Sequence, residues 1–117
     1  MRLNEVTFND AVPVDGYGPG FFRLGGEVHN APVAVLPTGV AVWGGFEDAS
    51  VFVAAAEQID FLLVGTGADI AHIPEALRGA LEAVGIGVEI MATPQACRTY
   101  NVLLGEGRRV GVALLGV

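Results

Sequence analysis

A short run of apolar residues near the middle of the chain organises the sequence. Phe61 to Val64 are four successive apolar residues, and Gly65-Thr66-Gly67 follows them. A strand without a polar face is typical of a sheet that is covered on both sides, so we predict that this run is the central buried strand of an α/β sheet. The two glycines allow a sharp turn and a close approach of the backbone to another element.

The rest of the second half alternates helical and extended patterns. Apolar residues recur at helical spacing, and helices are predicted from about residue 50 to 58, 74 to 84 and 96 to 104. Asp48-Ala49-Ser50 and Thr93-Pro94 are expected to cap the first and third of these helices, and Gly85 to end the second. Further strands are predicted over residues 86–91 and 109–115. This order predicts an α/β sheet with crossover helices in residues 47–117.

The first half has no helical spacing and predicts antiparallel hairpins. One hairpin covers residues 21–29 and turns at Gly25-Gly26, and a second turns at Pro37-Thr38-Gly39. Residues 15–20 are predicted to be a loop from their glycine and proline content. The hairpins must extend or cover the α/β sheet, so we expect a mixed sheet. A short edge strand is predicted through Val6, Phe8 and Val12.

The length of 117 residues fits a single domain, with a β-hairpin region in residues 1–46 and alternating α and β elements in residues 47–117. Hydrophobic residues make up 52% of the chain and there are 17 glycines. This apolar content indicates either a contact surface or a bias toward small residues. No apolar run approaches the ~18 residues that a membrane span needs, so no membrane insertion is expected.

The charge narrows the classes of partner. The formal net charge is −7, and all six basic residues are arginines. Because the chain has no basic stripe, we do not expect it to bind nucleic acid. The single cysteine cannot form an internal disulfide and fits a reducing compartment. Residues 1–5 resemble neither a signal peptide nor a transit sequence, so a cytoplasmic protein is expected.

Gly65-Thr66-Gly67 is the first candidate for chemistry. A dinucleotide-binding turn needs a third glycine where Ile70 stands, and a P-loop needs a lysine, which the chain lacks. A tightly packed loop is therefore favoured. Ligands of α/β proteins nevertheless bind at strand ends of this kind, where Thr66, Asp69 and His72 would lie. Histidine can act as a base near neutral pH, but a solvated His72 is the simpler interpretation.

The start of the third helix is the second candidate. Cys97 is predicted in its first turn, where the helix dipole favours a thiolate, but a buried, unreactive thiol is preferred because no base is nearby in sequence. Arg98 can bind an anion or pair with an acidic side chain. His29, His72 and Cys97 do not have the spacing of metal ligands, and no cofactor is expected. Trp43 is either a core anchor or a partner-facing aromatic. The candidate ligand pocket is lined by Gly65, Thr66, Gly67, Cys97, Arg98 and Tyr100.

The sequence resembles a family with a domain of unknown function. The motifs that carry the resemblance are residues 93–110, residues 63–67, residues 85–89, Gly20-Phe21-Phe22-Arg23, and Leu36-Pro37-Thr38-Gly39-Val40 before Trp43. The family includes the mitochondrial complex I assembly factor 3 and a human adipogenesis-associated protein. The resemblance implies a three-layer α/β fold with a mixed central sheet and no established enzymatic activity. It implies no catalytic residues.

Two hypotheses of function follow. The first is a non-enzymatic binding protein that resembles respiratory complex I assembly factors and has a protein partner of unknown identity. The alternative is an enzyme or a binder of a small anionic metabolite, which would use the pocket between Gly65-Thr66-Gly67 and the start of the third helix. The oligomeric state cannot be predicted from the sequence.

Overall fold

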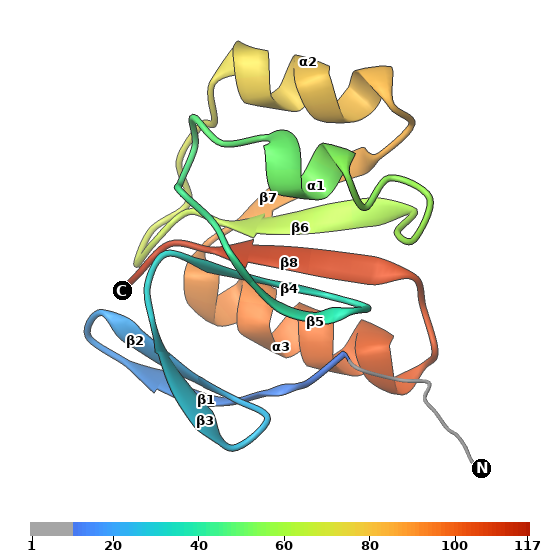
Figure 1. Cartoon of the computed structure of the whole chain (residues 1–117). Helices are drawn as coiled ribbons and strands as arrows, with labels where there is room; N and C mark the ends of the chain where they lie inside the picture. The colour runs from blue at the N-terminus through green and yellow to red at the C-terminus, as the bar shows by residue number, and fades with distance from the viewer. Residues whose placement is uncertain (1–10) are drawn as a thin grey trace, which may run out of the picture.

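Two sheets organise residues 11–117, the part of the chain that this computed structural model describes (Figure 1). The larger sheet has the strand order β5-β4-β8-β6-β7. Strand β8 is parallel to β6, and β6 is parallel to β7, whereas β4 is antiparallel to both β5 and β8. The predicted mixed sheet is therefore confirmed. Its strands are β4 (Val33–Leu36), β5 (Gly39–Val42), β6 (Phe61–Gly65), β7 (Gly87–Met91) and β8 (Val110–Leu114).

The middle of this sheet is occupied by β8 and not, as predicted, by the run Phe61 to Val64. Strand β6 is interior and buried, but it is the second strand from one edge. All five residues of β8 are buried. Gly111 allows this burial, because a Cβ atom there would lie only 2.9 Å from Cδ2 of Leu36. The sequence pattern detected burial on both faces, which these two strands share, but burial alone does not give strand order.

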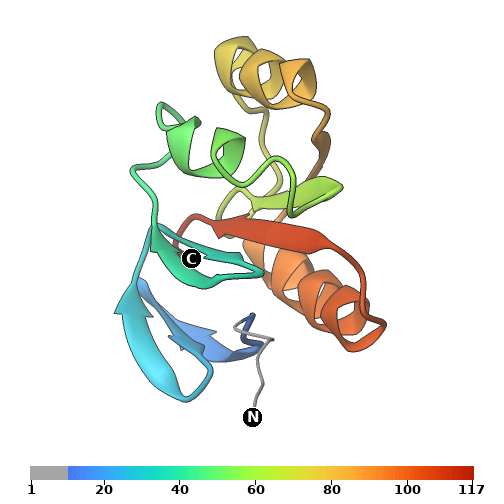
Figure 2. The same cartoon turned by 45° about the vertical axis from the view of Figure 1, so that its right-hand side comes forward.

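This sheet is the middle one of three layers (Figures 1 and 2). Helices α1 (Ser50–Val53) and α2 (Glu75–Ala83) cover one face, and α3 (Thr93–Gly105) covers the other. A smaller antiparallel sheet lies on the same side as α3. A hydrophobic core lies on each face of the sheet, and alternate residues of β6 point into one or the other. Leu63 packs with α3, while Leu62 and Val64 pack with α1 and α2. The smaller sheet consists of β1 (Val14–Gly18), β2 (Phe21–Leu24) and β3 (Glu27–Asn30).

The β1 strand overturns the prediction of a loop over residues 15–20. Residues Val14–Gly18 pair with β2, with an irregularity between Val14 and Gly16. The side chain of Asn101 on α3 holds Val14 from both sides, because its Oδ1 accepts the Val14 N–H at 2.9 Å and its Nδ2 donates to the Val14 carbonyl at 2.8 Å. Tertiary pairing thus overrides a loop-like composition. Of the predicted edge strand, Val6 and Phe8 lie outside the described residues, and Val12 belongs to none of the strands.

Both predicted hairpins are confirmed, but the first helix is shorter than predicted. It ends at Val53, and Ala55 and Ala56 already donate to the carbonyls three residues before them. The chain continues as tight turns to about Gln58, which still bury Ala55 and Ile59. The N-cap is Ala49, while an Asp48 carboxylate oxygen accepts from the Ser50 N–H at 3.2 Å and hydroxyl at 2.7 Å.

The second helix ends at a glycine, as predicted. Gly85 has φ +85°, its N–H donates to the Glu82 carbonyl, and Ile86 N–H donates to the Leu81 carbonyl. These two bonds form a Schellman motif. Among residues 11–117, no helix is long and apolar enough to cross a membrane.

Candidate functional site at the carboxyl ends of the strands

The parallel strands β6, β7 and β8 end at one edge of the large sheet, on the left of Figure 1. The chain leaves β6 at Gly65 and forms a loop over residues 66–74 before α2 begins. The helix α3 begins beside the same edge, two residues after β7 ends. This edge is where α/β folds most often place ligands, so its geometry tests what the candidate pocket can contain.

Thr93 is the buried centre of this edge, with no exposed surface. Its hydroxyl accepts the Gly67 N–H at 2.8 Å and donates to the Leu115 carbonyl at 2.9 Å. Its own N–H donates to the Gly67 carbonyl at 2.8 Å. One threonine therefore connects the loop after β6, the start of α3 and the end of β8. Thr93-Pro94 is the predicted helix cap, but the N-cap is Ala92 and the Thr93 hydroxyl bonds to other elements instead.

Gly65 packs directly on the beginning of α3. A Cβ atom at this position would lie 2.8 Å from Thr93 Oγ1, 3.0 Å from Thr93 Cα and 3.2 Å from the Ala96 Cβ. This contact explains the close backbone approach that the glycine pattern predicts. The element approached is the protein's own helix.

Thr66 shapes the loop that follows. Its hydroxyl lies 2.9 Å from the Asp69 carbonyl oxygen and accepts the Ala71 N–H at 3.0 Å. These bonds curl the loop so that Ile70 is 67% exposed, and Asp69 and His72 are exposed as well. A shallow hollow of about 270 Å³ is lined by Ile70, Ala71, His72 and Ile90. The edge thus presents a shallow, mainly apolar surface.

The predicted α3 residues point in different directions. Cys97 lies in the second turn and not, as predicted, in the first, and only 3% of it is exposed. Burial raises the pKa of the Cys97 thiol to about 11, although the neighbouring Arg98 lowers it slightly. The thiol is therefore protonated at neutral pH, which agrees with the preferred interpretation of a buried, unreactive cysteine.

Tyr100 and Arg98 occupy opposite environments. Tyr100 is fully buried, and its hydroxyl donates to the Val12 carbonyl at 2.8 Å. Burial also raises the pKa of the Tyr100 phenol above its usual range. Arg98 is exposed. Of the six residues predicted to line the ligand pocket, Gly65 and Gly67 meet α3 at Thr93, and Gly65 also lies against Ala96. A ligand pocket lined by the six residues stays a prediction.

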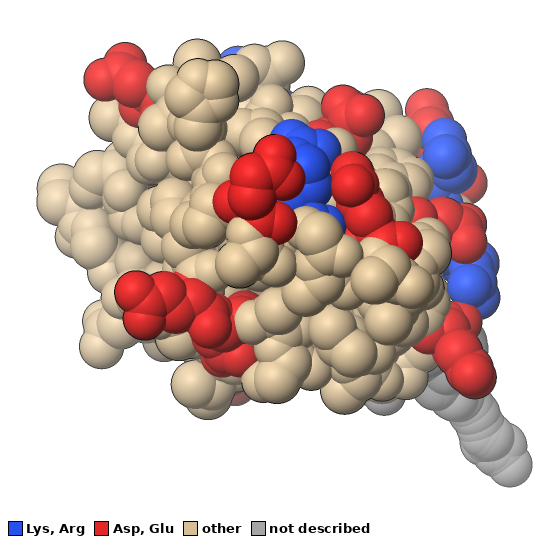
Figure 3. Space-filling view, turned by 90° about the horizontal axis from the view of Figure 1, so that it is seen from above, with Lys and Arg blue, Asp and Glu red and all other residues tan. Residues whose placement is uncertain are grey.

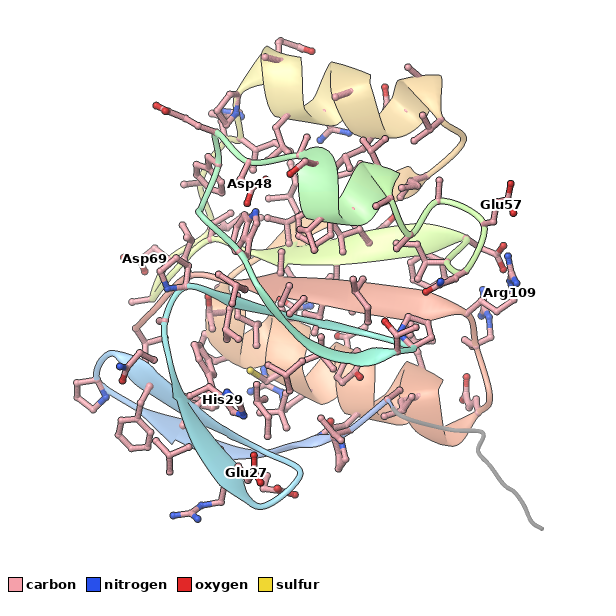
Figure 4. The ribbon with its side chains drawn as sticks, in the orientation of Figure 1. Glu27, His29, Asp48, Glu57, Asp69 and Arg109 are labelled. Carbon is pink, nitrogen blue, oxygen red and sulfur yellow. The ribbon has the colours of Figure 1, made fainter. Side chains whose placement is uncertain are left out.

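The remaining candidate residues from the sequence are Trp43 and the histidine His29. Trp43 is a core anchor, because it is 2% exposed, packs against Phe52 and donates its indole N–H to the Asp48 carbonyl at 2.9 Å. His29 lies in β3 with its Nε2 atom 3.9 Å from a Glu27 carboxylate oxygen (Figure 4). Within residues 11–117, no three His, Cys, Asp or Glu side chains are grouped in a way that could hold a metal ion.

The amino ends of the same strands have a different character. Arg109, just before β8, donates from Nε to Asp60 Oδ1 at 3.3 Å and from Nη2 to the Glu57 carbonyl at 2.9 Å. Arg109 and Glu57 lie on the right of Figure 4, opposite Asp69. Arg108 lies 5.3 Å from the centre of the Phe61 ring. A hollow of about 480 Å³ is lined in part by Glu57, Arg108 and Arg109. Figure 3 shows basic groups beside acidic ones in the middle and at the right of the view from above.

Solved structures share this three-layer fold. A Bordetella pertussis protein described as an Mth938-like domain matches with a TM-score of 0.74 and 32% sequence identity, over 99% of this chain and 92% of that chain. A structure titled as an outer membrane protein from Bartonella henselae matches with a TM-score of 0.84 and 36% identity, over 95% of this chain and 99% of that chain. The fold is therefore that of Mth938-like α/β proteins.

The chain belongs to the family described as protein of unknown function (DUF498/DUF598), whose model matches residues 14–115. An uncharacterized protein of Rhodobacter capsulatus is 51% identical over 98% of this chain and 93% of its own length. NADH dehydrogenase (ubiquinone) 1 alpha subcomplex assembly factor 3 of Rattus norvegicus and of Homo sapiens is 36% and 34% identical, over 98% of this chain. The matches span 66% of these two assembly factors, slightly less than two thirds of their length. The resemblance predicted from the sequence motifs is confirmed.

Proposed function

We propose that this chain is a non-enzymatic assembly factor that binds a protein subunit of a respiratory NADH dehydrogenase. The observation that carries the proposal is the match to relatives named as assembly factors of that enzyme, which extends over 98% of this chain. A match of this extent includes the whole fold and the loop at the carboxyl ends of the strands.

The character of the candidate site supports protein binding over catalysis. Its single thiol is buried and protonated, and its buried threonine hydroxyl is already bonded to two backbone groups. The exposed part of the site is a loop on which Ile70 is 67% exposed, beside a mainly apolar hollow. Exposed apolar side chains beside a shallow hollow suit a broad protein surface better than an enclosed metabolite. We assign this loop, residues 66–73, as the docking surface.

Human cells that lack the 34% identical assembly factor provide the test. This chain, carrying a mitochondrial targeting sequence, is expected to restore assembled NADH dehydrogenase, measured on native gels and as NADH:ubiquinone reductase activity. Tagged protein from the same mitochondria is expected to co-purify subunits of the enzyme, identified by mass spectrometry. A folded, imported chain that neither restores assembly nor co-purifies any subunit would contradict the proposal.

Two exposed apolar positions offer a matched pair of variants. Ile70→Asp is expected to abolish both restoration and co-purification, because it places a charge in the assigned docking surface. Val102→Asp is the control, since Val102 is 60% exposed, similar to the 67% of Ile70, but lies on α3. Equal loss in both variants, at unchanged thermal stability, would remove the loop from the proposal.

A further inference from the structure

The outer edge of β5 differs from the other sheet edges of the described residues. Strand β7 carries Glu89 and β3 carries Glu27, and charged side chains of this kind discourage pairing with another strand. The edge strand β1 is held to α3 by Asn101. Strand β5, Gly39–Val42, pairs only with β4 among residues 11–117 and has none of these protections.

The whole hairpin that ends in β5 is free of charge. No Arg, Lys, Asp or Glu occurs between residue 28 and Glu47, although six arginines and 13 acidic residues occur in the chain. Val42 is 93% exposed and Val40 is 36% exposed. An uncharged edge strand with exposed β-branched side chains is a template for pairing with another strand.

A hollow borders this edge on the face of Val40 and Val42. It has a volume of about 290 Å³ and is lined by Pro32, Val33 and β5 on one side and by His29 and Asn30 of β3 on the other. The register places Val42 opposite Val33 and Val40 opposite Val35, so these valines form an apolar strip on one face of the hairpin. Val33 and Val35 are buried, so within residues 11–117 the edge offers unpaired backbone groups and only the exposed part of this strip, at Val40 and Val42.

We propose that the β5 edge pairs antiparallel with the β5 edge of a second copy, so that one continuous sheet crosses the dimer. The absence of charged side chains along the hairpin favours a second copy as the pairing partner. A strand with a charged side chain against the hairpin would leave that charge desolvated without a partner, whereas a second copy contributes the same uncharged edge. Val42 of each copy is covered in the paired state.

The dimer is expected to be weak and to strengthen with salt. A pair of four-residue strands and the adjoining hollow are smaller than the ~800 Å² per partner of a standard interface, so a dissociation constant of about 10 μM or weaker is expected. Each copy carries a net charge of −7, so the copies repel at long range. Added salt screens this repulsion and has no interfacial ion pair to weaken.

Sedimentation equilibrium of the full chain tests the proposal between about 10 μM and about 1 mM. The expected result is a monomer–dimer equilibrium that shifts toward dimer in sodium chloride. Val42→Lys is expected to weaken dimerisation at least tenfold with an unchanged melting temperature, because Val42 is almost fully exposed in one copy. Val102→Lys, on α3, is the control and is expected to dimerise like the natural chain.

Amide chemical shifts locate the contact independently. On dilution, the largest shift changes are expected at Gly39–Val42, and those of α3 should stay constant. A monomer at about 1 mM, changes centred on another element, or equal dimerisation by Val42→Lys would overturn the proposal and assign the β5 edge to a different occupant, such as a strand of a partner protein. These outcomes do not depend on the assembly-factor proposal, which concerns residues 66–73.

Discussion

The two ends of the parallel strands are stabilised by different physical means. At the carboxyl ends, Thr93 is fully buried and connects three elements through neutral hydrogen bonds of 2.8–2.9 Å. At the amino ends, Arg109 and Asp60 form an ion pair at 3.3 Å with 56% and 60% of their side chains exposed. Water competes for exposed charges but not for buried hydroxyls. We therefore expect the buried hydrogen bonds at the carboxyl ends to contribute more to the free energy of unfolding than the exposed ion pair at the amino ends.

The substitution Thr93→Val is expected to have the largest effect on this comparison. It keeps the shape of the side chain but leaves the Gly67 N–H and the Leu115 carbonyl without their bonds to the hydroxyl. An unsatisfied buried group costs about 1–3 kcal/mol, and here one buried and one partly buried group lose their bonds, so a loss of about 3 kcal/mol in the free energy of unfolding is expected. Urea denaturation monitored by circular dichroism measures it.

The control for this prediction is the same change elsewhere on the same helix. Thr99 is partly exposed, and among residues 11–117 its hydroxyl forms no hydrogen bond to a buried backbone group, so Thr99→Val should change stability by less than about 0.5 kcal/mol. If the two variants unfold at the same urea concentration, the Thr93 hydroxyl does not stabilise the carboxyl-end junction.

Cys97 extends the comparison to pH. The unfolded thiol loses its proton near pH 9.0, but the buried thiol keeps it until about pH 11. Below about pH 9, the free energy of unfolding is therefore unaffected by the thiol's ionisation. It falls as the pH rises from about 9 to about 11, because in this range only the unfolded chain is stabilised by loss of the thiol proton. Two pKa units correspond to about 2.7 kcal/mol, which is the upper limit of the expected loss.

The measurement compares the natural chain with Cys97→Ala by urea denaturation at several pH values. Truncation of a buried side chain makes the variant less stable at pH 8. The stability difference should narrow toward pH 11, because the variant lacks the thiol while both chains retain Tyr100 and its own alkaline titration. A difference that stays constant from pH 8 to pH 11 would contradict a raised thiol pKa.

Two glycine-to-alanine substitutions are expected to change the stability in opposite directions and by smaller amounts. Gly65→Ala is expected to destabilise the protein by about 2 kcal/mol, because the new methyl group meets the Thr93 backbone as well as its side chain. Gly79→Ala is expected to stabilise it by about 0.5–1 kcal/mol, since Gly79 lies inside α2 with no atom within 4 Å of the new Cβ. Thermal unfolding distinguishes the signs, and a neutral Gly65→Ala variant would show that the contact with α3 can relax.

Sequence periodicity predicted most of the fold. Both hairpins, the buried run at Phe61 to Val64 and the glycine end of α2 follow from local rules that the sequence displays directly. The β1 strand and the middle position of β8 do not, because they depend on pairing with residues distant in sequence. Asn101, for example, holds Val14 across 87 positions, which no local pattern indicates.

The sequence pattern places Gly65 and Gly67 at the carboxyl end of a strand, and there they contact the start of α3. The predicted second wall begins at Cys97, whereas the contacts are made by Thr93 and Ala96, so the candidate pocket stays a prediction. The sequence pattern predicts Thr93 only as a helix cap, although this residue joins the loop after β6 to the start of α3. Its only signal was a threonine before a proline, and this pattern is the same whether the hydroxyl caps its own helix or bonds to another element.

A substitution at the amino ends of the strands is expected to have the smallest effect on the free energy of unfolding. Arg109→Ala removes the ion pair with Asp60 and the bond to the Glu57 carbonyl. The strand starts stay joined without it, because Asp60 N–H donates to the Arg109 carbonyl at 2.8 Å and Gly87 N–H donates to the Asp60 carbonyl at 3.0 Å. The side-chain groups are exposed, so a loss below about 1 kcal/mol is expected, shrinking further in about 1 M salt.

Arg78→Ala serves as the reference for this measurement, because Arg78 and Glu82 form another exposed ion pair, at 3.4 Å along α2. A pair of this kind contributes about 0.3–0.5 kcal/mol, so the two arginine variants should unfold at nearly the same urea concentration. If Arg109→Ala instead costs as much as Thr93→Val, the exposed end stabilises the sheet as strongly as the buried one. The contrast between the two ends would then rest on surface character alone, with paired charges at the amino ends and a mainly apolar hollow at the carboxyl ends.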